Sequence, residues 1–250
     1  MNLLRPLIGK EIQEDFRSAR GAFFLVVAAL VLSVFAVLLV SNTELSLLDN
    51  AQAVYLMAGL VIALAALVAV LRGSEGFAGE RERETLETLL LTPATGHRLA
   101  WAKLLGILFS WLILFILAIP YLWAVGSAGQ NLLPALWYLF ITGTLIVLIL
   151  GGPALAFSAR MKSFKGVLSL GLTLLLLLGS PVVLGPSLRQ SAVGRILDLA
   201  NPLAGTLNTL DSVIIDSQGV ALQLVRLTIM IAYSLAVLWF LKAVTRRIEP

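Results

Sequence analysis

The sequence predicts an all-α integral membrane protein with six transmembrane helices, and two features of its composition carry this prediction. Hydrophobic residues make up 59% of the 250 residues and charged residues only 13%, where a soluble domain carries about 25%. The hydrophobic residues gather in six blocks that hold no charge except Arg226, each near the 20 or so residues that a helix needs to cross a bilayer. Because a backbone in lipid must pair its own polar groups, such blocks form helices.

We expect one transmembrane domain over residues 1–250, with spans at residues 21–41, 51–71, 104–125, 132–157, 167–184 and 221–241. The first block is too long for a signal peptide and follows a charged segment, so we expect it to remain a span. The chain has no cysteine and one histidine, His97. Neither a thiolate metal site nor a catalytic residue is therefore expected.

Basic residues indicate which side of the membrane each loop occupies. All but three of the 18 Lys and Arg residues fall before the first span, after the last span, or in the loops between spans two and three and between spans four and five. The exceptions are Arg189, Arg195 and Arg226. The positive-inside rule then puts both termini in the cytoplasm of a multi-pass protein of the inner (plasma) membrane. No basic patch of the kind that binds nucleic acid is apparent.

Residues 1–20 have the pattern of an amphipathic helix. Leu4, Ile8, Ile12 and Phe16 recur every four residues, which is one stripe of a helix. We expect it to lie along the cytoplasmic interface, either simply anchoring the first span or also contacting a partner protein. The polar positions that matter for the second interpretation are Lys10, Glu11, Glu14 and Arg17.

The loop at residues 72–103 contains a predicted short helix. Residues 80–91 are rich in helix formers, and Pro93 stops the helix soon after. The pairs Arg81–Glu84 and Arg83–Glu87 have the spacing of helix-surface ion pairs. The leucine face needs a partner, either this protein's own helix ends or a groove in another protein. It consists of Leu86, Leu89 and Leu90.

Residues 185–219 form the longest segment on the opposite side. The segment is too interrupted to cross the membrane, partly by Asn201-Pro202, and too apolar for a free loop. We expect it to re-enter the outer leaflet as short helices before the sixth span, buried in protein.

The loop string GERERETLETLLLTPATGHRLAWAKLLG resembles the cytoplasmic coupling loop of type-two ABC exporter permeases. The interfacial helix and the segment around Asn201 and Pro202 resemble elements of the same family. The sequence differs from the family pattern at Glu84, where many members have glycine. A glutamate in place of glycine favours a helix there. The resemblance implies a coupling helix whose ATPase-contacting residues are Glu80, Arg81, Arg83, Glu84, Thr85, Leu86, Glu87, Leu89, Leu90, Pro93 and Arg98.

The resemblance also implies the partners. Family members pair with a second permease subunit, identical or related, and with a dimer of separate ATPase subunits whose groove receives the coupling helix. No G-x-x-x-x-G-K-[ST] phosphate loop exists here, since Gly9-Lys10 is followed by Glu11. ATP and Mg²⁺ are therefore expected in the partner, and membrane lipid around the spans. The implied function is that of an exporter permease subunit, not an enzyme.

Two other classes of protein stay open. An ATP-independent secondary transporter or channel usually keeps ionisable relays at membrane depth, and the middles of these spans have none. An intramembrane enzyme would need an activated nucleophile, and the serines and threonines of the spans have no His or Asp at their depth.

Overall fold

The computed structural model describes residues 9–10, 13, 19–41, 50–85, 95–126, 132–180, 191, 196, 199–215 and 220–246. Over this part of the chain every regular element is a helix. The elements are α2 (Ala19–Ser41), α3 (Asn50–Glu82), α5 (Gly96–Gly126), α6 (Leu132–Arg160), α7 (Phe164–Gly179), α10 (Pro202–Ile214) and α11 (Val220–Thr245).

Five of these helices, α2, α3, α5, α6 and α11, are long and apolar enough to cross a membrane. The protein is therefore an all-α integral membrane protein, as predicted. The predicted fifth span corresponds to α7, whose 16 residues measure about 24 Å at 1.5 Å per residue, short of a bilayer core of about 30 Å. Residues 181–184 of that span lie outside the described residues, so the count of six stays a prediction.

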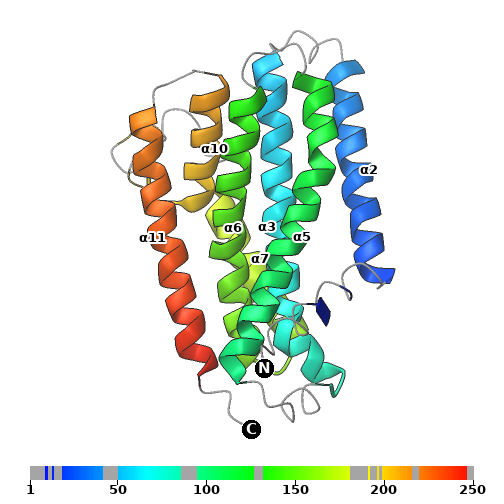
Figure 1. Ribbon diagram of the computed structural model, residues 1–250, viewed down its shortest axis with the longest axis vertical. Coiled ribbons are helices and arrows are strands. Elements are labelled where there is room, and N and C mark those ends of the chain that lie inside the picture. The colour runs from blue at the N-terminus through cyan, green and yellow to red at the C-terminus, as the bar shows by residue number, and fades with distance from the viewer. Residues whose placement is uncertain are drawn as a thin grey trace.

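The long helices lie side by side, with α2 and α11 at opposite edges of the bundle (Figure 1). The central helix α3 packs against α5, α6 and α7 and supplies much of the core, including Met57, Val61, Ala65 and Phe77. By contrast, α2 and α11 expose apolar side chains such as Val26, Leu30 and Trp239. These two edge faces are therefore apolar and largely uncovered by the described residues.

We call one end of the bundle the basic end. It is formed where α3, α6 and α11 end and where α5 and α7 begin, at the bottom of Figure 1. Its basic residues are Arg81, Arg83, Arg98, Lys103, Arg160, Lys162, Lys165, Lys242 and Arg246. The helix directions therefore gather three of the four basic segments that the sequence places on one side of the membrane.

At the basic end, α3 continues well past the predicted end of the second span. It remains helical through residues 72–82, which the sequence assigns to a loop, and α5 begins at Gly96 instead of near residue 104. Close packing explains the extension, because a Cβ at Gly73 would lie 2.6 Å from the Gly151 carbonyl oxygen of α6. The loss of hydropathy at Arg72 marks the end of the apolar block and not the end of the helix.

The end of α3 corrects the prediction of one continuous helix over residues 80–91, since residues 80–82 are helical, the helix ends before Glu84, and residues 86–91 lie outside the described residues. Glu84 has a φ of 58°, the left-handed conformation that terminates helices. Its N–H donates to the Arg81 carbonyl at 3.1 Å, and the Thr85 N–H donates to the Glu80 carbonyl at 3.0 Å. These two bonds form a Schellman motif, so Glu84 ends the helix that it was expected to favour.

Helix α10 lies inside the bundle, packed against α6, α11, α3 and α7. Asn201 caps it, because Oδ1 accepts from the Leu203 N–H at 2.9 Å and the Ala204 N–H at 3.3 Å, while Pro202 occupies its first turn. The Asn201 Nδ2 also donates to the Leu178 carbonyl of α7 at 2.6 Å. The Asn201-Pro202 pair therefore starts a buried short helix beside the end of α7. The side from which this segment enters the membrane stays a prediction.

Candidate functional site

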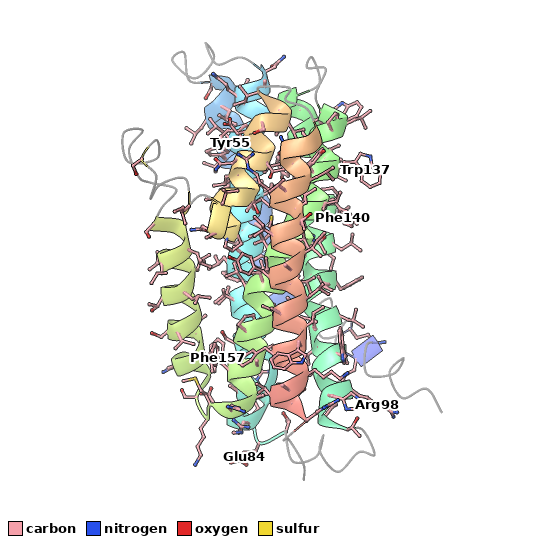
Figure 2. The ribbon with its side chains drawn as sticks, turned by 90° about the vertical axis from the view of Figure 1, so that its left-hand side faces the viewer. Tyr55, Glu84, Arg98, Trp137, Phe140 and Phe157 are labelled. Carbon is pink, nitrogen blue, oxygen red and sulfur yellow. The ribbon has the colours of Figure 1, made fainter. Side chains whose placement is uncertain are left out.

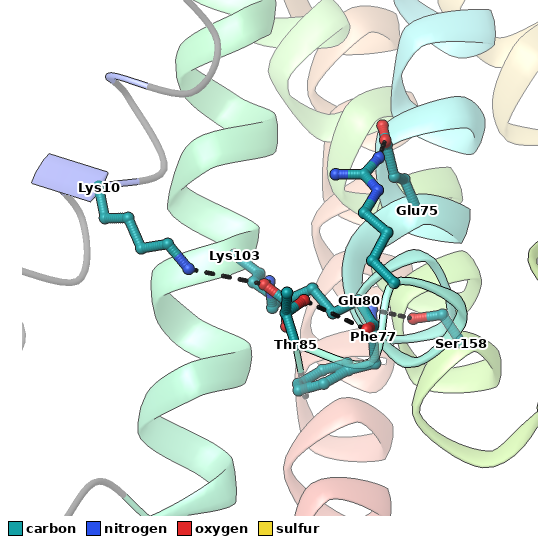
Figure 3. A network of polar contacts seen from close by, with 8 residues as sticks. Lys10, Glu75, Phe77, Glu80, Thr85, Lys103 and Ser158 are labelled. Atoms are coloured by element: carbon teal, nitrogen blue, oxygen red, sulfur yellow. Dashed lines mark hydrogen bonds and ion pairs between the residues drawn. The ribbon is translucent and has the colours of Figure 1, made fainter. Parts of the chain in front are cut away.

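A buried ion pair joins the last turns of α3 to the first turns of α5. The Lys103 Nζ lies 2.7 Å from the Glu80 Oε1, and the side chains are 5% and 11% exposed respectively. The Lys103 Nζ also lies 5.6 Å from the centroid of the Phe77 ring, within the range of a cation–π contact. The pair therefore fixes the spacing of α3 and α5 where the chain leaves one helix and returns in the other (Figure 3).

Lys10 reaches the same carboxylate from the N-terminal segment. Its Nζ lies 4.0 Å from the Glu80 Oε1, and its side chain is 45% exposed. Figure 3 shows the two lysines approaching Glu80 from different segments. The other carboxylate oxygen, Oε2, is buried and has no hydrogen-bond partner among the described residues. Glu80 thus holds three segments together at the basic end.

Sequence reasoning selected Glu80 and missed its contact with Lys103. Glu80 follows the uncharged run Phe77-Ala78-Gly79 on α3, and Lys103 stands just before the apolar block of α5. Because consecutive helices run antiparallel here, these boundary positions meet although they are 23 residues apart. The signal that could have revealed the pair is an acidic residue after the uncharged run at residues 76–79 and a basic residue just before the next apolar block.

Arg81 and Glu82, the next two residues, contact the turn between α6 and α7. The Arg81 guanidinium donates to the carbonyls of Met161 and Ala159, the latter at 3.2 Å. The Glu82 Oε1 accepts from the Phe164 N–H at 2.8 Å. The predicted Arg81–Glu84 pair is therefore wrong, since Arg81 turns toward α6 where α3 ends. Glu82 was not singled out by the sequence.

Arg83 forms an ion pair with Glu75, which lies two turns back on α3. Glu87, the predicted partner of Arg83, lies outside the described residues. Outside them too are Leu86, Leu89, Leu90, Pro93, Glu11, Glu14 and Arg17, so the leucine face and most of the interfacial helix stay predictions.

The remaining predicted residues lie around the α3–α5 connection. The Thr85 Oγ1 donates to the Glu80 carbonyl at 3.2 Å, which adds to the cap of α3. Arg98 is exposed in the first turn of α5, and its N–H donates to the Thr95 carbonyl at 2.9 Å. Figure 2 shows Glu84 and Arg98 at the same end of the molecule. The two ends of this connection are thus well anchored.

A second polar region joins α10 to α11, far from the basic end. The Arg226 Nη1 donates to the Asn208 carbonyl at 2.9 Å and to the Ser212 Oγ at 3.0 Å. The Tyr233 hydroxyl donates to the Ala200 carbonyl at 2.9 Å. Because its guanidinium binds α10, Arg226 fixes the short helix to α11. This is a structural use for the one charge inside the predicted sixth span.

Comparison with known proteins agrees with this geometry. Residues 16–180, well over half of the 250 residues, match the family model described as "ABC-2 family transporter protein". The match includes α2, α3, α5, α6 and α7. It therefore includes Glu80 and Lys103 but not Lys10. A search of curated proteins finds no match to the chain. The chain belongs to the ABC-2 family of transporter proteins, and it is a multi-pass membrane permease of an ABC transporter.

Proposed function

We propose that the chain is the permease subunit of an ABC exporter and that a separate ATPase subunit dimer energises it. The single observation that carries this proposal is the buried Glu80–Lys103 pair. It locks the end of α3 to the start of α5, so a force applied to the connection between them moves both helices together. The resemblance of this connection to the coupling loop of exporter permeases supports the direction of transport.

The partners and the location follow from the same proposal. The protein lies in the inner (plasma) membrane with its basic end on the cytoplasmic side. The ATPase binds ATP and Mg²⁺ on that same side. A second permease subunit completes the transporter. This subunit and the surrounding lipid together cover the exposed apolar faces of the bundle. The exposed residues of α2, such as Phe23, Val26 and Leu30, are suited to either neighbour.

The test is whether an ATPase co-purifies with the chain and whether its activity depends on the coupling segment, which is the stretch between the end of α3 and the start of α5. The tagged chain is purified from its native membranes in mild detergent, and Mg²⁺-dependent ATP hydrolysis is measured in the purified complex. We expect activity with the wild-type chain and its loss with the triple variant L86D/L89D/L90D, because a charged face cannot enter an apolar groove. A matched control is L224D, because Leu224 is an exposed apolar residue of α11 that is remote from the basic end.

Two results would overturn the proposal. One is a purified wild-type chain without any nucleotide-hydrolysing subunit. The other is transport by proteoliposomes that contain the chain alone and no nucleotide, which would favour the ATP-independent transporter or channel. Arg226 is the observation on which that alternative would depend, but its guanidinium already binds Asn208 and Ser212.

A further inference from the structure

We propose that Arg81 and Glu82 are positioning residues that carry the movement of the coupling segment to the turn between α6 and α7, instead of contacting the ATPase. This inference rests on the proposed function and extends it, since it gives the route by which movement at the α3–α5 connection enters the rest of the bundle.

Arg81 binds the end of α6. The last carbonyls of a helix have no partner within it, and a cation there also interacts favourably with the helix dipole. The Arg81 guanidinium meets both conditions, since Nη1 donates to the Met161 carbonyl and Nη2 to the Ala159 carbonyl. A planar guanidinium makes two such bonds at a fixed geometry, so α6 follows the end of α3.

Glu82 binds the start of α7. The N-cap residue of α7, Ser163, makes no side-chain capping bond, although serine is among the preferred caps. The Glu82 carboxylate instead accepts from the Phe164 N–H, the first N–H of α7, at 2.8 Å, and such an N–H has no partner within its own helix. The first N–H of α7 is therefore satisfied by α3, while the side chain of its own N-cap residue makes no capping bond.

Packing behind these two residues makes the contact stiff. The Phe77 N–H donates to the Ser158 Oγ of α6 at 3.2 Å, and a Cβ at Gly76 would overlap the Leu155 side chain. With Gly73 against Gly151 and Ala154, the last three turns of α3 press closely on α6. A rigid body of this kind transmits a displacement instead of absorbing it.

Arg83 provides a matched control. It follows Glu82 directly and forms an ion pair, but its partner Glu75 belongs to α3 itself. Removing the charge of Arg83 therefore alters the same stretch of chain without touching α6 or α7.

The experiment measures movement instead of transport, so no cargo is needed. In the cysteine-free chain, spin labels are placed at T173C on α7 and V26C on α2, which are both exposed positions. The distance between the labels is compared in the intact complex with its ATPase, without nucleotide and after trapping with ATP and vanadate. We expect trapping to shift the distance in the wild-type background and in R83Q.

In R81Q and in E82A, which removes the acceptor of the Phe164 N–H, we expect the shifted fraction to fall by about 2- to 30-fold, the range of coupling changes that single residues produce. The affinity for the ATPase and its rate of ATP hydrolysis should stay within twofold of wild type, by order of magnitude, because coupling variants need not alter either binding site. If R81Q does not fold, E82A still tests the inference, since Glu82 is exposed and its replacement leaves no buried gap.

A second substitution, at the N-cap of α7, distinguishes whether Glu82 transmits movement to α7 or only caps that helix. In the double variant E82A/S163D, an aspartate at the N-cap gives α7 its own acceptor. We expect thermal stability to recover and the shift to remain lost. Recovery of the shift would overturn the inference, because Glu82 would then be only a cap. An unchanged shift in R81Q and E82A would also overturn the inference while leaving the proposed function intact. A wild-type chain that purifies without an ATPase would overturn both the inference and the proposed function.

Discussion

Glu84 carries the backbone conformation that ends α3, with a φ of 58°. An L-residue in the left-handed region costs about 1–2 kcal/mol, and glycine avoids most of that cost. Since glycine also loses more entropy on folding, we expect E84G to raise the stability of the purified protein by about 1 kcal/mol or less. Thermal unfolding in detergent measures this change.

The control for this prediction is E84A, which removes the carboxylate but keeps a Cβ. A carboxylate near a helix C-terminus is mildly unfavourable, so a gain in E84A equal to that in E84G would attribute the effect to charge and contradict the backbone explanation.

At Glu80 and its two lysine partners, burial decides how much the loss of each charge destabilises the protein. The variant E80Q leaves the Lys103 ammonium, which is 5% exposed, without its carboxylate. Breaking a buried pair in this way costs about 3–5 kcal/mol. Lys10 is 45% exposed, so we expect K10M to cost about 1 kcal/mol or less. Equal losses of thermal stability in the two variants would show that solvent screens Glu80 as much as it screens Lys10.

At the scale of the helices, glycines decide how closely α3 approaches α6. A Cβ at Gly73 would lie 2.6 Å from a backbone oxygen and 2.7 Å from the Ala154 Cβ, and neither atom can rotate away. We expect G73A to destabilise the protein by about 1–3 kcal/mol, as overpacking does, with thermal unfolding and the yield of monodisperse protein as measurements.

Gly205 of α10 offers the matched control, since a Cβ there would have nothing within 4 Å. Alanine is favoured over glycine inside a helix by about 1 kcal/mol, so G205A should be neutral or stabilising. A loss of stability in G205A that matched G73A would mean that helix packing does not explain the Gly73 effect.

The same helices show what the sequence could predict. Hydropathy located α2, α3, α5, α6 and α11 because a bilayer demands long apolar segments. It missed the extension of α3 through Glu82, because Gly73, Gly76 and Gly79 lower helix propensity. The helix continues there because these glycines pack against α6 and neighbouring side chains, and the sequence alone does not show those contacts. The resemblance drew attention to Glu80 and Arg81. It did not predict their partners Lys103, Ala159 and Met161, because those contacts depend on how distant helices pack.

At the scale of the whole molecule, helix directions bring the basic segments to one end, whatever the membrane around them. Glu80 lies there with Lys103, and so do the contacts of Arg81 and Glu82 with the α6–α7 turn. The proposed coupling therefore requires this end to face the compartment that holds ATP, which makes the orientation of the chain its most general condition.

Orientation can be measured directly, because the natural chain has no cysteine. Two exposed positions at opposite ends of the bundle are Lys162, beside the α6–α7 turn, and Gln52, in the first turn of α3. In sealed right-side-out vesicles, a membrane-impermeant maleimide should label Q52C at once and K162C only after the vesicles are opened, because basic segments stay in the cytoplasm. The reverse pattern would place Glu80 and the α3–α5 connection on the side without ATP. No cytoplasmic ATPase could then reach them, and the Glu80–Lys103 pair would only stabilise the bundle.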